Sequence, residues 1–498
     1  MTERAEGPRL YGNWRAERGW GVGSLSTTAT IAVFVAVLAP LLAVSAYPPA
    51  ALPLFAASAV VVGGTVVRIG GFSLADVAMR RVRFHRARGA RWTELSGGVL
   101  TEHPRGLDLP GVLAPLRPLE IDDGRGGRHA LLWHRGTGDL TAVLRCSPIG
   151  LDLADPDRAD AWVASWGALL ADLGYQPLVR HLAVTVDTVP TGGATVRDHV
   201  AAALDADAPG LSRRIMAELT ELTPATTAET HTWVALCLDP ARATPRPQDL
   251  LAAAVEVGQR LPAIENQLAA CGVAVLGRAG TEWLTGRIRA AFDPHARPIV
   301  LGEPDDPQAS RWAEAGPVAA SERWEHYRHE GGLSVTWGLR EAPRQAVAAG
   351  VLAPLLAPGP FPRRVTWLYH PYPAEQAAAQ VENEITSGQV RRAWAERTRR
   401  DETQRERDDR GRAIQSAREE AEGAGVGRFT LYVTTTVLHD EHLPAAVADI
   451  EQRAGQAKLR LRRLRGAQAA GFAAGLGIGI DPTDLLTGRT RSRTRRRR

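Results

Sequence analysis

The sequence predicts a mixed α/β protein, with an N-terminal transmembrane helical hairpin followed by two related cytoplasmic α/β halves. Three observations support this fold class. No charged residue occurs between Arg18 and Arg68, a strand–helix alternation occurs twice behind that window, and a Pro-, Asp- and Gly-rich stretch at 293–320 separates the two occurrences. The length of 498 residues suffices for roughly three domain-sized units.

The composition is globular and mildly basic. Apolar residues make up 44% and charged residues 23% of the chain, and the formal net charge is +5. Lys458 is the single lysine, so nearly every positive charge is an arginine. The three cysteines, Cys146, Cys237 and Cys271, match neither a zinc-site spacing nor a CxxC motif. This low cysteine content fits a reducing compartment for the part outside the membrane.

Two apolar runs, roughly 25–46 and 51–67, fill the uncharged window and are joined through Tyr47-Pro48-Pro49. A helix needs about 20 apolar residues to cross the hydrocarbon core, and prolines at the junction favour a turn. A signal peptide is a weaker alternative because its apolar region spans only about 7 to 15 residues. A buried hairpin in a soluble core is another alternative. We predict a transmembrane hairpin at 25–68, with membrane-embedded residues Ile31, Phe34, Leu38, Leu42, Phe55, Val60 and Val67.

Arginines flank the hairpin on both sides. The predicted membrane-flanking basic residues are Arg15, Arg18, Arg68, Arg80 and Arg81. Because positive residues favour the cytoplasmic side, residues 1–24 and everything after the hairpin are expected in the cytoplasm, below the cytoplasmic (inner) membrane. Within the connector 69–127, residues 73–91 are expected to form a basic helix beside anionic headgroups, or equally a solvated linker.

The first α/β domain is expected at 128–292. Strands at 128–135 and 139–147 flank Gly136-Thr137-Gly138, which predicts a β-hairpin. A helix follows at 157–174, where Trp162 and Leu169 belong to an apolar set at helical spacing. The remaining expected elements are a strand at 181–189, a helix at 195–221, a strand at 231–239, a helix at 247–271 and a strand at 273–276.

A linker at 293–330 and a second α/β domain at 331–480 are expected next. The elements of this domain are strands at 364–372 and 428–438 and helices at 374–422 and 443–464. The helix 374–422 carries dense mixed charge, which favours a solvated helix, with a coiled-coil partner as an alternative. A disordered tail is expected at 481–498.

Motifs for catalysis are mostly missing. A Walker-type phosphate loop needs a lysine behind a glycine loop, and Lys458 follows none. The clusters GAGVG (423–427) and GLGIG (475–479) lack the strand-then-helix order of dinucleotide binding, so we expect turns. His326, His329 and Glu330, and likewise the segment 439–442, resemble metal ligands without offering a third ligand at a recognisable distance. No catalytic, metal or cofactor site is therefore predicted.

The C-terminal sequence GRTRSRTRRRR (488–498) predicts an anion-binding tail. Its candidate residues are Arg493, Arg495, Arg496, Arg497 and Arg498. Contacts of such a tail with phosphates are blind to sequence and weaken with salt. The inner leaflet or an acidic protein is favoured over DNA as its partner.

Four segments together resemble a known family. They are LYGNWRAERG (10–19) before the hairpin, WLYHPYPAEQA (367–377), GVGRFTLYVTTTV (425–437) and LRGAQAAGFAAGLGIG (464–479). The pattern is similar to an actinobacterial membrane protein family encoded with conjugation-type (type IV) secretion components. The hairpin resembles the small two-span subunit of these systems. Residues 92–480 more distantly resemble the N-terminal domain of the conjugation ATPase, without its motor.

The resemblance implies a membrane-anchored, non-catalytic scaffold that docks a separate secretion ATPase or other multi-span channel subunits, with homo-oligomerisation expected. Two alternatives stay open. One is a DNA-handling membrane protein of a conjugative element that uses its arginine tail. The other is a membrane-tethered enzyme with an unrecognised site around His326, His329 and Glu330.

Overall fold

The computed structural model of the protein describes residues 11–12, 14, 27–46, 48–69, 72–97, 108–123, 126–150, 154–190, 200–201, 203–205, 207–221, 228–298, 312–373, 376 and 425–483. Three predicted features lie essentially outside these residues: the flanking arginines Arg15 and Arg18, the charged helix 374–422, and the arginine tail with Arg493 and Arg495 to Arg498.

A single large sheet forms the centre of the molecule. Its strands are β3 (Glu94–Ser96), β4 (Leu116–Asp122), β5 (Arg128–His134), β6 (Leu140–Pro148), β7 (Val179–Pro190), β8 (Ala228–Leu238), β9 (Val273–Arg278), β10 (Ala319–Glu322), β11 (Tyr327–His329), β12 (Gly332–Glu341), β13 (Arg363–Pro371), β14 (Gly427–Val437) and β15 (Arg460–Arg463). The order in this 13-stranded sheet is β3-β10-β11-β12-β14-β13-β7-β8-β6-β5-β4, with β15 beside β12 and β9 beside β6. All pairings within it are antiparallel.

The helices are α1 (Thr27–Ala46), α2 (Pro48–Val66), α3 (Leu74–Gly89), α4 (Pro156–Gly174), α6 (Gly210–Glu221), α7 (Leu250–Ala270), α8 (Thr281–Phe292), α10 (Ala353–Leu356), α13 (Leu443–Gln456) and α14 (Gln468–Gly475). The mixed α/β class is thus confirmed. The two expected halves meet strand to strand, because β13 pairs with β7 and Val365 lies opposite Val186. Their strands therefore belong to one continuous sheet.

Most of the predicted elements are present near their predicted bounds. The β5–β6 hairpin and β7, β8, β9, β13 and β14 agree with the sequence, as do α3, α4 and α7. Of the predicted helix 195–221, the structure gives α6 at its C-terminal end. The predicted linker 293–330 ends in β10 and β11, which are too short to show a periodicity.

One helix boundary was wrong. The helix expected at 443–464 ends at Gln456, and residues 460–463 form β15 against β12 instead. Lys458 adopts a positive φ of 57°, which stops the helix and turns the chain back to the sheet. The alternation of Leu459 and Leu461 with arginines suits a short strand better than a helix.

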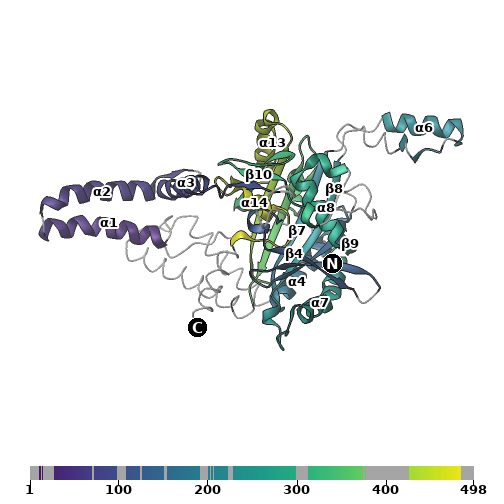
Figure 1. The fold of residues 1–498 in the computed structure, drawn as a ribbon, viewed down its shortest axis with the longest axis horizontal. Helices are drawn as coiled ribbons and strands as arrows, with labels where there is room; N and C mark the ends of the chain where they lie inside the picture. Colours follow the sequence, from purple (N-terminus) through teal and green to yellow (C-terminus); the bar gives the residue numbers. More distant parts are fainter. Residues whose placement is uncertain are drawn as a thin grey trace, which may run out of the picture.

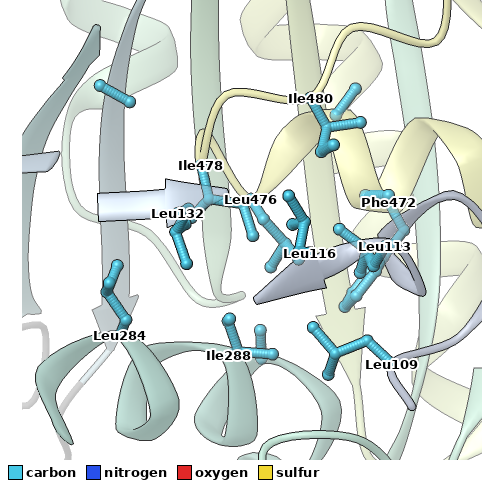
Figure 2. Close-up of a cluster of buried hydrophobic side chains, with 14 of the residues drawn as sticks. Leu109, Leu113, Leu116, Leu132, Leu284, Ile288, Phe472, Leu476, Ile478 and Ile480 are labelled. Carbon is cyan, nitrogen blue, oxygen red and sulfur yellow. The ribbon is translucent and has the colours of Figure 1, made fainter. Parts of the chain in front are cut away.

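Helices cover both faces of the sheet. On one face, α4 and α7 pack over the β6–β8 region, and α10 and α13 cover β12, β14 and β13. On the other face, α8 and α14 enclose a core that includes Leu132, Ile288 and Phe472 (Figure 2). Residues 464–479, one of the four segments that carry the family resemblance, also lie on this second face.

Residues 468–481, the C-terminal strap, run from α14 across that face and are almost fully buried. The carbonyl oxygen of Gly475 accepts hydrogen bonds from Thr366 Oγ1 and Arg364 Nε, each 2.8 Å long. Trp233 Nε1 donates to Gly477 O at 3.1 Å. Gly477 has a φ of 63°, and a Cβ there would collide with Thr185 Oγ1. The GLGIG cluster is therefore a buried backbone path over strand threonines, which explains its glycines.

The helical hairpin predicted at the N-terminus is present. Helices α1 and α2 lie side by side and project from the body of the protein (Figure 1). Among the residues that the structure describes, no helix has the length and apolar character that crossing a membrane requires.

Candidate functional site

The outer surface of the hairpin is apolar on both helices. On α1 the side chains of Ile31, Phe34, Leu38 and Leu42 are 59%, 61%, 52% and 65% exposed. On α2 and just after it, Leu52, Phe55, Val60 and Val67 are 82%, 47%, 75% and 48% exposed. Every residue predicted to be membrane-embedded thus lies on an exposed surface. A contiguous apolar surface of this kind indicates contact with an apolar partner or phase.

Small and polar residues occupy the inside of the hairpin instead. Pro40 is buried, and Ala36 and Ser58 are half-buried where the helices meet. Ser58 Oγ donates to the carbonyl oxygen of Ala36 at 2.5 Å, and Thr65 Oγ1 donates to Val61 O at 2.9 Å. These hydroxyls are satisfied without water, as an apolar environment demands.

The hairpin continues into α3 through the small sheet of β1 (Arg68–Ile69) and β2 (Phe72–Ser73). Ser73 caps α3, because its Oγ accepts a hydrogen bond from the backbone N–H of Asp76 at 3.1 Å. Phe84 is buried and packs edge-on against Trp324, with ring centroids 5.4 Å apart. This contact attaches α3 to the body of the protein.

The predicted flanking arginines of this region have mixed roles. Arg68 is exposed at the hairpin base. The guanidinium of Arg80 lies 3.6 Å from the ring centroid of Phe72, and that of Arg81 lies 4.8 Å from Trp324. Burial against these contacts lowers the pKa of Arg80, which remains a cation. The contacts of Arg80 and Arg81 therefore help to fix α3 to Phe72 and to Trp324 in the body of the protein.

The outward side of α3 combines apolar and basic residues. Met79 and Val82 are 54% and 48% exposed, and Trp92 just beyond the helix is 82% exposed. Arg83 and Arg86 lie at helical spacing beside them and are exposed too. Exposed tryptophan with arginine is typical of a surface at the boundary between water and lipid.

A polar cavity lies where the C-terminal strap ends. A small cavity of about 20 Å³ is lined by His134, Thr137, Asp139, Thr141, Arg180, His181, Gly479, Ile480 and Asp481. Arg180 Nη1 lies 2.6 Å from Asp139 Oδ2, and His370 Nε2 lies 2.9 Å from Asp481 Oδ2. A cavity of this size holds a single water molecule and is far too small for a substrate.

The contacts of Asp481 show that the groups around this cavity attach the end of the strap to the sheet. Burial alone would raise the pKa of Asp481, but hydrogen bonds from His370 and Thr483 outweigh burial and lower that pKa to about 2. The carboxylate is therefore ionised and fixes the end of the strap to β13. No pattern in the sequence brought these residues together.

The predicted alternative site around His329 has a structural role. His329 is 3% exposed, and its Nδ1 donates to Phe292 O at 2.5 Å. Its Nε2 accepts from Ser334 Oγ at 2.8 Å, so both ring nitrogens are engaged. Burial lowers the pKa of His329 to about 4, which keeps the ring neutral.

The neighbours of His329 are engaged as well. Glu330 accepts two hydrogen bonds from Arg289, of 2.7 and 3.0 Å, and burial lowers the pKa of His326. His439 and His442 lie in a surface turn with ring centroids 5.9 Å apart. Nowhere in the described part of the chain do three His, Cys, Asp or Glu side chains come together as a metal site would require.

No protein-family model matches the chain, and a search of curated proteins finds no match.

Proposed function

We propose that the protein is a membrane-anchored, non-catalytic scaffold of a conjugation-like (type IV) secretion apparatus, which docks a separate ATPase or channel subunit. The exposed apolar surface of the α1–α2 hairpin is the observation that carries the anchoring part. The secretion context rests on the four sequence segments that resemble the actinobacterial family. In this arrangement the hairpin is embedded in the cytoplasmic membrane, and both termini lie in the cytoplasm.

The energetics favour embedding of the hairpin. Moving one fully exposed Leu, Ile or Phe side chain out of water is worth about 1.5 to 3 kcal/mol. The hairpin exposes Phe34, Leu42, Leu52 and Val60 by 61% to 82%. A soluble protein that left this surface in water would forgo several kcal/mol of stabilisation.

The basic helix supports the same orientation. Each arginine near an anionic membrane surface contributes on the order of 1 kcal/mol. Arg83 and Arg86 on α3 are exposed next to Met79 and Val82, so the helix presents both features of an interfacial surface. In the proposed arrangement α3 lies at the inner leaflet, with the large sheet on its cytoplasmic side.

A flotation experiment tests the anchor. Purified full-length chain is mixed with vesicles of phosphatidylglycerol and phosphatidylethanolamine and floated through a density gradient. Leu38→Arg with Val60→Arg should abolish flotation, because each Arg in place of an aliphatic residue costs about 3 kcal/mol inside a bilayer. The matched variant Leu38→Ala with Val60→Ala should still float. Equal flotation of the arginine and wild-type proteins would refute the anchor.

Co-purification tests the scaffold. Tagged full-length chain is solubilised from its native membranes in mild detergent, and the proteins bound to it are identified by mass spectrometry. Recovery of a P-loop ATPase with multi-span secretion subunits would support the proposal. Recovery of the chain alone, from membranes that contain those proteins, would contradict it.

A further inference from the structure

A cluster of four arginines lies at one end of the sheet, on the face that α8 covers. The cluster, hereafter the arginine cluster, consists of Arg145, Arg287, Arg297 and Arg364. Arg287 interacts electrostatically with Arg145 and Arg297, and Arg364 interacts with Arg297. Sheet register brings its parts together: Arg364 of β13 lies opposite Asp187 of β7, and Asp187 lies opposite His231 of β8. Arg145 of β6 lies opposite Trp233, two residues further along β8.

The charges in this cluster do not balance. Arg297 Nη2 lies 2.9 Å from Asp187 Oδ2 and its Nε lies 3.9 Å from Glu229 Oε2. Arg287 donates to His231 Nδ1 at 3.0 Å, and His231 Nε2 in turn donates to Glu229. Among the residues that the structure describes here, four arginines face two carboxylates, which leaves an excess of two positive charges in that set.

Several of the guanidinium groups have donors without acceptors. Arg364 is 7% exposed, and its Nη2 makes no hydrogen bond among the described residues. The same holds within those residues for Arg145 Nε and for Arg287 Nε and Nη1. Buried cationic donors without partners are costly, so such a cluster is suited to an anionic ligand.

The backbone makes room for the cluster. Gly277 has a φ of 148° beside a register shift between β6 and β9, and a Cβ there would lie 3.2 Å from Arg145 Nη2. The side chains of Glu229 and His231 are 41% and 27% exposed, so the cluster borders solvent at the start of β8. Burial lowers the pKa of Arg287 to about 10, with Arg297 and Arg145 adding to this effect.

The geometry points to a binding site for a phosphate-class oxyanion, held by the forked guanidinium groups of Arg145 and Arg287, which lie close enough to interact electrostatically. Arg364 adds positive charge from the side of the strap, where its Nε donates to Gly475 O. Guanidinium donors match the oxygen spacing of phosphate, and a doubly charged phosphate would neutralise the excess of two charges. Asp187 and Glu229 would hold Arg297 in place at the edge of the site.

Thermal unfolding of the detergent-solubilised full-length chain tests the site. Sodium phosphate and pyrophosphate are titrated against sodium chloride at matched ionic strength. Saturable stabilisation by the phosphates beyond that of chloride is expected, since a ligand that binds only the folded state raises its stability. A response identical to that of chloride would overturn the proposal.

Two arginine variants and a control locate the binding. Arg145→Gln and Arg287→Gln should each weaken the phosphate response at least about tenfold. Arg260→Gln on α7 should retain it, because Arg260 pairs with Glu256 at 2.7 Å on the opposite face of the sheet. Full retention of the response by Arg145→Gln would contradict the site.

Two further measurements do not depend on whether Arg287→Gln folds: the melting temperature of Arg145→Gln and the phosphate affinity of Asp187→Asn. The buried Nε of Arg145 has no hydrogen-bond acceptor within the described residues, so Arg145→Gln should raise the melting temperature without phosphate. Asp187→Asn removes a competing carboxylate and should tighten phosphate binding about tenfold. Weaker binding by Asp187→Asn would argue for a purely structural cluster.

Discussion

Lowering the pH from 7 to 4 should destabilise the protein through His329. In the folded state the ring is buried and its pKa is lowered to about 4, whereas an unfolded histidine has a pKa of about 6.5. The unfolded state therefore binds more protons between these values, and the stability falls as the pH decreases through this window. The contribution is complete above pH 6.5 and lost by about pH 4. At about 1.4 kcal/mol per pKa unit, it amounts to roughly 3 kcal/mol.

Urea unfolding at a series of pH values measures this slope. The variant His329→Asn keeps a donor for the carbonyl oxygen of Phe292 but cannot titrate, so its stability should vary less with pH between 6.5 and 4. Some slope should persist, because burial also lowers the pKa values of His129 and His326. His442→Asn is the matched control, since the side chain of His442 is 57% exposed. An unchanged slope in His329→Asn would refute the assignment of a neutral, buried ring.

Two further predictions concern the strap and the base of the hairpin. Gly477→Ala should lower the free energy of unfolding, measured by urea titration, by about 2 kcal/mol or more, because the new side chain combines a positive φ with a collision at Thr185. Gly455→Ala in α13 is the control. A Cβ there meets open space, so this change should be neutral or stabilising in the same titration. Phe84→Ala should loosen α3 from Trp324 and speed tryptic cleavage within α3, whereas Met79→Ala, at a side chain that is 54% exposed, should not; equal cleavage rates would contradict the anchoring contact.

The sequence identified elements whose signal is local. Alternating apolar residues between turns predicted β5 and β6, and the spacing of Trp162 and Leu169 predicted α4. The two helices of the hairpin also followed from the sequence, because an uncharged window needs no tertiary information to be recognised. The start of α2 did not, since the helix begins at Pro48, inside the stretch predicted to turn.

Elements that depend on tertiary contacts did not follow from the sequence. The strap is rich in Ala and Gly and has no periodicity, and its burial is determined by Thr366, Thr185 and Trp233 on three separate strands. In the same way, Arg145 and Arg364 are far apart in sequence, and only the order β13-β7-β8-β6 brings them to one end of a face. The register of a sheet is set by long-range pairing, which no local pattern encodes.

The attachment of α3 connects the proposed anchor to the sheet. Phe72, at the end of the small sheet that follows α2, lies beneath the guanidinium groups of both Arg80 and Arg462, at 3.6 and 4.1 Å from its ring centroid. Arg462 belongs to β15, which pairs with β12, and the carbonyl and amide groups of Thr336 in β12 bond to Gln468 at the start of the strap. A continuous series of packed and hydrogen-bonded groups thus extends from the hairpin base to the strap. The proposed scaffold would need such a connection, because a partner docked on the sheet would then be held in a fixed position relative to the proposed membrane anchor.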